Sequence, residues 1–165
     1  MAEIALGVRD RGGRQGTGTA ALVALDAATS VVRRIDVDLA ADVPERRLFH
    51  AMVDPGAEAP IPDTTAVRHA AAAAEAAARD ALDDLIAALP GHRLVGIAVP
   101  VGVPGPEVLD LPVAEILASH SLAHAAEAEL YRDALATAAT AVGLPVTRYP
   151  VRGLRAAAAN ALGVT

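Results

Sequence analysis

An alanine-rich segment at residues 63–91, DTTAVRHAAAAAEAAARDALDDLIAALPG, is the strongest structural signal in the sequence. Asp63 or Thr64 can cap the first free amides of a helix, and Pro90-Gly91 ends it. The first half is nearly all alanine, which buries little area but lets another backbone come close. Only 2% of the chain is aromatic although 53% is hydrophobic, so the core has to be built from aliphatic side chains. This composition favours small-faced helices packed on a sheet.

Short apolar segments elsewhere in the chain predict strands, and the fourth is apolar throughout, as is typical of a central strand. The predicted strands are residues 3–8, 19–25, 30–39, 92–102 and 145–150. Besides 63–91, the predicted helices are residues 45–52, 113–118, a longer one that ends near 142, and 152–163.

The order of these elements predicts the fold class. Short links join the first three strands as antiparallel hairpins, and helices connect the last two strands. We therefore expect one α/β domain over residues 1–165, with a mixed five-stranded sheet and helices on both faces.

Composition excludes several classes of function. There is no cysteine, and therefore no disulfide, thiolate zinc site or cysteine nucleophile. The formal net charge of −6 does not favour nucleic acid as a partner. No apolar run is long enough to span a membrane, and no leader sequence is evident, so a cytoplasmic location is expected.

The C-terminal segment ALATAATAVGLPVTRYPVRGLRAAAANALG resembles RuvC-type Holliday junction resolvases, whose domain is ribonuclease H-like. The matching positions are Gly143, Leu144, Pro145, Val146, Tyr149, Arg152 and Arg155. IALGVRDRGG resembles the first strand of that family, and the order of elements is that of the ribonuclease H-like fold. The resemblance implies a homodimer and a nuclease site with divalent metal ions.

The catalytic carboxylates of that family are missing. Such nucleases hold two cations with about four carboxylates, which clamp the attacking and leaving oxygens. The first acid should follow Val8 directly, but Arg9 stands there and Asp10 comes one residue later. The fourth strand, VGIAVPVG, offers no acid, and the C-terminal segment RGLRAAAANALGVT offers none either. The resemblance therefore implies a ribonuclease H-like protein without the standard nuclease site.

A second resemblance concerns RDRGGRQGTGTAALVALD, which is similar to the phosphate-binding hairpin of actin-like sugar kinases. It implies phosphate binding by glycine amides and a threonine, with arginine adding charge. The positions are Gly12, Gly13, Gly16, Thr17 and Gly18, with Arg11 or Arg14. The alternative is a hairpin without a ligand.

The stretch SHSLAHAAEAELYRD at residues 119–133 carries the candidate site. On a helix, His124 lies roughly 40° to one side of His120 and Glu127 roughly 20° to the other. These three residues predict a site for zinc, nickel or manganese, with Tyr131 and Arg132 as further ligand-binding residues. A neutral imidazole would also suit a general base, so the catalytic candidates are Asp10, His124 and Glu127.

The same stretch has a structural interpretation. Ser119 or Ser121 caps the helix, and a cap at Ser121 would leave His120 outside it. On this interpretation Glu127, Tyr131, Glu129 and Asp133 face water, and Glu129 pairs with Arg132 at i,i+3. Asp36 and Asp38 share one face of the third strand, where they either pair for a metal or protect a sheet edge.

Three hypotheses follow for function, and whether the chain is an enzyme stays open. The first is a ribonuclease H-like protein that binds a metal or small ligand at His120, His124 and Glu127. The second is a divergent metal-dependent nuclease that uses Asp10, Glu127 or Glu129 as ligands. The third is a non-catalytic interaction module that uses the alanine face or the edge of the third strand.

Overall fold

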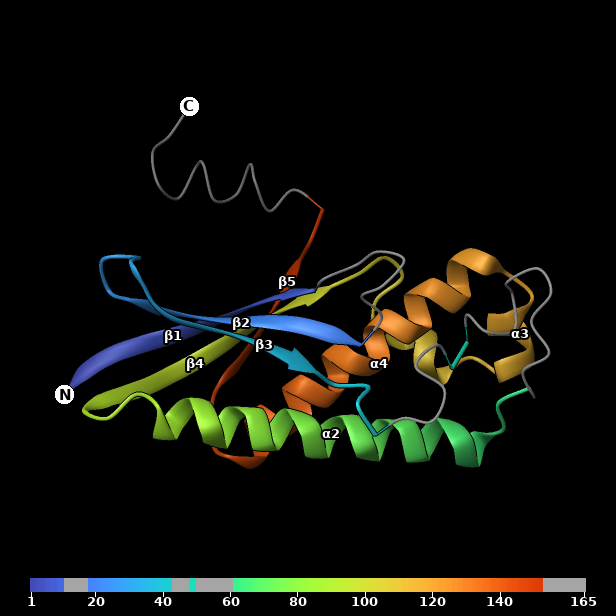
Figure 1. The fold of residues 1–165 in the computed structure, drawn as a ribbon. Coiled ribbons are helices and arrows are strands. Elements are labelled where there is room, and N and C mark those ends of the chain that lie inside the picture. The colour runs from blue at the N-terminus through green and yellow to red at the C-terminus, as the bar shows by residue number, and fades with distance from the viewer. Residues whose placement is uncertain (11–17, 43–47, 50–60, 153–165) are drawn as a thin grey trace.

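Five strands form one open mixed sheet in the order β3-β2-β1-β4-β5 (Figure 1). The computed structural model describes residues 1–10, 18–42, 48–49 and 61–152. β2 is antiparallel to both of its neighbours, whereas β4 is parallel to β1 and to β5. The strands are β1 (Ala2–Asp10), β2 (Thr19–Asp26), β3 (Val31–Asp38), β4 (His92–Val101) and β5 (Val146–Pro150). The predicted α/β class, the two hairpins and all five strands are confirmed.

The described helical segments follow the predicted order with one addition. They are α2 (Thr64–Ala87), the 3-10 helix η1 (Pro106–Asp110), α3 (Val113–Leu117) and α4 (His120–Ala141). η1 lies between the strand predicted at 92–102 and the helix predicted at 113–118, where neither a helix nor a strand was predicted. Of the helix predicted at 45–52, only Leu48 and Phe49 are described, and they form a turn. The helix predicted at 152–163 lies outside the described residues apart from Arg152.

α2 is flanked by the residues that the sequence predicts to begin and end it. Asp63 is the N-cap, because its side-chain carboxylate accepts the Ala66 N–H at 2.7 Å. Beyond the last turn, Gly91 has φ +81°, a conformation that glycine adopts without steric cost. Between these ends, one buried stripe repeats at helical spacing: Ala70, Ala74, Ala78, Leu82 and Leu85.

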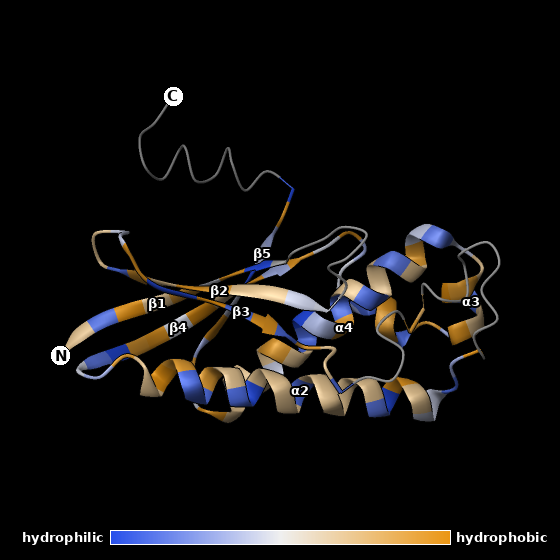
Figure 2. Ribbon diagram, viewed as in Figure 1, coloured by the Kyte–Doolittle hydropathy of each residue, from blue (hydrophilic) through white to orange (hydrophobic). Residues whose placement is uncertain are grey.

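α2 and α4 lie beneath the same face of the sheet (Figure 1). Ile4, Leu22 and Val99 point from that face into one core with both helices. The helices expected on both faces are therefore found on one face within the described residues. Figure 2 shows β1, β2 and β4 as largely apolar and α2 as alternating between tan, apolar bands and blue, hydrophilic bands. None of the described helices is both long and apolar enough to cross a membrane.

The alanine stripe of α2 is covered by the chain itself. Ala74 and Ala78 are fully buried, as are Ala126 and Ala138 of α4, against which α2 packs. Small side chains on both helices allow this close approach. The hypothesis of a partner-binding alanine face is therefore wrong for the buried stripe.

Replacing Ala74 with leucine is expected to destabilise the protein by about 1–3 kcal/mol, because it adds volume where α2 meets α4. Ala76 is exposed two residues further along the same helix, so Ala76→Leu is the matched control and should change stability little. Chemical denaturation of both variants measures the difference. Equal stability of the two variants would contradict the packing described.

Candidate functional site

The carboxyl ends of β1 and β4 form the edge of the sheet at which ligands bind in open α/β folds. The described β1–β4 ladder has its last pair at Gly7 and Ala98, so the two strands part beyond it. Tyr149 of β5 reaches across this edge, and its hydroxyl donates to the Val8 carbonyl at 2.8 Å. Side chains from α4 and β5 meet here.

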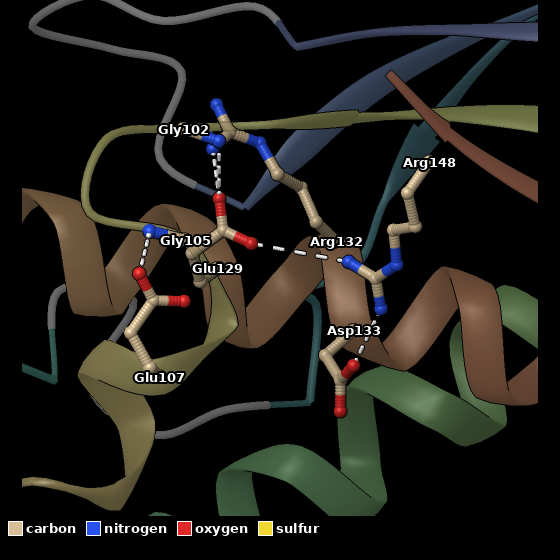
Figure 3. Close-up of polar contacts among 7 residues, drawn as sticks. All are labelled: Gly102, Gly105, Glu107, Glu129, Arg132, Asp133 and Arg148. Atoms are coloured by element: carbon tan, nitrogen blue, oxygen red, sulfur yellow. Dashed lines mark hydrogen bonds and ion pairs between the residues drawn. The ribbon is translucent and has the colours of Figure 1, made fainter. Parts of the chain in front are cut away.

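Glu129 is the centre of this group. Its side chain is 0% exposed, and it comes from the middle of α4. One carboxylate oxygen, Oε1, accepts the Gly102 N–H at 2.8 Å and also a hydrogen bond from Arg132 (Figure 3). Gly102 directly follows β4, so this carboxylate fixes α4 against the end of β4.

Arg148 links the same carboxylate to β5. Its Nη1 lies 3.9 Å from Glu129 Oε2, and its Nη2 donates to Asp133 at 2.6 Å (Figure 3). Arg148 pairs with Val99 of β4 in the sheet register, which sets its side chain on the helix-covered face. Two carboxylates and two guanidinium groups therefore balance in charge at this edge. We call Glu129, Arg132, Asp133 and Arg148 the carboxylate–arginine cluster.

Gly102 lies in close contact with the cluster. A Cβ atom at this position would lie 2.8 Å from Arg132 Nη1 and 3.0 Å from Glu129 Oε1. A larger residue would therefore push both groups away from the backbone amide. In the loop that follows, Glu107 accepts the Gly105 N–H at 3.0 Å, which closes the turn beside the cluster (Figure 3).

The two histidines of the predicted metal site, His120 and His124, lie together in the first turns of α4. Ser119 is the N-cap and accepts the Leu122 N–H at 3.4 Å. His120 is therefore inside the helix, as the predicted metal site at His120, His124 and Glu127 requires. His120 and His124 are both exposed, and their Nε2 atoms are 2.9 Å apart. The rings meet edge to face with centroids 4.5 Å apart.

The other predicted site residues lie elsewhere. Glu127 is 1% exposed and Tyr131 is 5% exposed, so the expectation that Glu127, Glu129 and Tyr131 face water is wrong. Among the described residues, no group of three or more His, Cys, Asp or Glu is placed to hold a metal ion. Two of the three predicted metal ligands, His120 and His124, are thus in contact. The set that also includes Glu127 stays a prediction.

Tyr131 and Arg132 occupy structural positions. The Tyr131 ring packs against Gly18: a Cβ atom added at Gly18 would lie 3.1 Å from Cζ of Tyr131. Gly18 also has φ +82°, a conformation that favours glycine. Arg132 pairs with Glu129 at i,i+3, as predicted. Of the phosphate-binding hairpin, only Gly18 is described; its other positions, Arg11, Gly12, Gly13, Arg14, Gly16 and Thr17, lie outside the described residues.

Three further candidate carboxylates lie on strands. Asp10 is the last residue of β1 and pairs with Ala20 of β2. Asp36 and Asp38 lie on β3, which is an edge strand, as the edge-protection hypothesis requires. The sequence interpretation missed Arg148 and Gly102, because neither is linked to Glu129 by local spacing.

Comparisons with known proteins give no further assignment: no family model, no curated protein and no solved structure matches this chain.

Replacing Glu129 with glutamine is expected to lower stability by roughly 2–4 kcal/mol, because it removes the fully buried negative partner of two partly buried guanidinium groups. In a chain of this size that corresponds to a fall in Tm of roughly 4–16 °C. Asp133→Asn is the control, since Asp133 is half exposed and its loss should cost less. An unchanged Tm in Glu129→Gln would show that the cluster does not stabilise the fold.

Replacing Gly102 with alanine is expected to destabilise the protein, because the new Cβ collides with the carboxylate and guanidinium groups described above. Gly7→Ala is the matched control: Gly7 is also a strand-associated glycine at this edge, and a Cβ there meets nothing within 4 Å. Thermal unfolding should therefore separate the two variants. A Gly102→Ala protein as stable as Gly7→Ala would contradict the close approach.

Proposed function

We propose that this chain is a ribonuclease H-like protein that binds a divalent transition-metal ion at an exposed histidine pair and does not cleave nucleic acid. The observation that carries the metal site is the hydrogen bond between His120 Nε2 and His124 Nε2, which are 2.9 Å apart. An ion bound by both nitrogens would replace the proton of this hydrogen bond, which is released to solvent. The fold assignment rests on the order of elements and on the resemblance of the C-terminal segment. Nothing in the comparisons bears on it.

The geometry of the pair favours particular ions. With metal–nitrogen bonds of roughly 2.0–2.1 Å, two nitrogens 2.9 Å apart subtend an angle of roughly 90° at the ion. Adjacent positions of square-planar or octahedral coordination have this angle, which suits Cu²⁺ and Ni²⁺. A tetrahedral Zn²⁺ site needs a wider angle and a small opening of the pair. Water or a small ligand would complete the coordination.

The carboxylate–arginine cluster is the argument against a nuclease. A two-metal mechanism needs carboxylates that are available to cations at the edge of the sheet. Here Glu129 is bound by Gly102, Arg132 and Arg148, and a cation would have to displace guanidinium groups. β4 also ends in Val99, Pro100 and Val101, with no acid.

Two remaining expectations belong to the proposal. The resemblance implies a homodimer. A cytoplasmic location stays an expectation from the sequence.

The test is thermal unfolding with Cu²⁺, Ni²⁺, Zn²⁺ and Mg²⁺ on the wild type, His120→Ala and His124→Ala. An ion at a hundredfold above its Kd stabilises the native state by about 2.7 kcal/mol, which raises Tm by roughly 5–11 °C. We expect this rise with Cu²⁺ or Ni²⁺ in the wild type and its loss in either variant. His69 is an exposed histidine on α2, so His69→Ala is the matched control and should keep the rise.

Two outcomes would contradict the proposal. Equal metal responses in the wild type and His124→Ala would place any bound ion elsewhere. Cleavage of branched DNA or structured RNA with Mg²⁺ or Mn²⁺, abolished by Asp10→Asn, would establish the nuclease alternative instead.

A further inference from the structure

Within the described part of the chain, β3 is an edge strand of the sheet, and its eight residues make it long for an edge strand. It hydrogen-bonds to β2 on one side and is the last strand in the sheet order. Its first two residues, Val31 and Val32, are 62% and 38% exposed. Long edges with exposed apolar residues are templates for pairing with another strand.

The charges on β3 are arranged in two blocks. Its sequence is VVRRIDVD, in which Arg33 and Arg34 precede Ile35, while Asp36 and Asp38 follow it. The strand is therefore positive at one end and negative at the other. In a second copy of the same strand, placed antiparallel beside the first, the arginines would lie next to the aspartates of the first copy.

We propose that two copies of this chain associate through β3, with the strands antiparallel across a two-fold axis that passes through Ile35. The two sheets then form one continuous sheet of ten strands, since each copy contributes five. This inference does not depend on the metal site.

The pleat limits the registers that are allowed. Opposite residues in an antiparallel pair must lie on the same face of the sheet, and their outward N–H and C=O groups must meet. Both properties alternate along the strand with period two. Only registers in which a residue lies opposite itself satisfy them under two-fold symmetry.

Charge selects one of these registers. With Arg34 at the axis, two guanidinium groups face each other; with Asp36 there, two carboxylates do. With Ile35 at the axis, Arg34 of each copy faces Asp36 of the other, so two opposite-charge pairs form. Within one chain the same two residues already lie 3.7 Å apart on the same face and are half exposed.

A groove beneath β3 supports the same register. Its volume is about 410 Å³, and its apolar lining includes Ile35 and Val37 of β3 and Leu85 of α2. Ile35 of the second copy would meet Ile35 at the mouth of this groove. Arg33 of the second copy would lie opposite Val37, beside a groove that Asp36, Asp38 and Asp84 also line.

The charges on β3 also explain why pairing would be limited to its own copy. Charged residues on an edge strand oppose pairing with foreign strands. A strand of different sequence would bury or oppose these charges without compensation. The edge of β3 therefore favours pairing with a second copy of β3 over pairing with strands of other sequence.

Single-cysteine variants test the register directly, because the chain has no cysteine of its own. A disulfide needs Cα atoms roughly 4.4–6.8 Å apart, whereas diagonal neighbours across strands are roughly 7–8 Å apart. We expect Ile35→Cys to form a covalent dimer under mild oxidation, and Arg34→Cys and Asp36→Cys to do so much more slowly. Equal crosslinking of all three, or none at Ile35→Cys, would overturn the proposed register.

Charge reversal tests the association without a disulfide. Sedimentation should show that the wild type dimerises and that Arg34→Asp or Asp36→Arg alone weakens the dimer roughly tenfold to hundredfold. The double variant, Arg34→Asp with Asp36→Arg, should restore it, because the pairs are only exchanged. Asp83→Arg on the exposed side of α2 is the matched control and should leave the dimer unchanged.

The outcomes of this experiment are decisive. A wild type that stays monomeric at its highest soluble concentration would overturn the proposal, as would a dimer that neither reversal weakens. Circular dichroism of each variant separates loss of association from loss of fold.

Discussion

The close contact between α2 and α4 is the constraint on which the rest of the structure depends. Two long helices pack closely beneath one face of the sheet, and more than half of the residues that each of them buries are alanines. Bulkier residues would separate the helices. Separation would move α4 away from the sheet and Glu129 away from Gly102, so the packing of the smallest side chains sets the geometry of the polar cluster.

The carboxylate–arginine cluster shows what this placement does to charge. Glu129 is fully buried, and its cost of desolvation is offset by a backbone amide and two guanidinium groups. The edge of the sheet at which comparable folds carry out chemistry is thus held together by ion pairs. The two exposed histidines of α4, His120 and His124, lie instead at its start.

Much of the fold could be predicted from local patterns. The Asp63 cap and the stripe of buried residues through Leu85 are signals contained in one segment, and they defined α2. The apolar run of β4 likewise indicated a central strand. Such elements depend mainly on their own residues.

The candidate site was harder to predict, because burial on α4 does not follow one stripe. Glu127 and Glu129 are roughly 200° apart around the helix, yet both are buried. The middle of α4 is therefore enclosed on several sides, and helical spacing alone could not tell which polar residues reach water. Arg148 is in a different element, nineteen residues after Glu129, so no local pattern connects the two.

The positions of the two tyrosines have a spectroscopic consequence. The chain contains two tyrosines and no tryptophan. Tyr131 packs against Gly18, and Tyr149 bonds to the Val8 carbonyl, so both lie where β1 and β4 part. Tyrosine emission, with no tryptophan to mask it, therefore originates at this edge, and the unlabelled protein carries its own optical reporter of the sheet's carboxyl end.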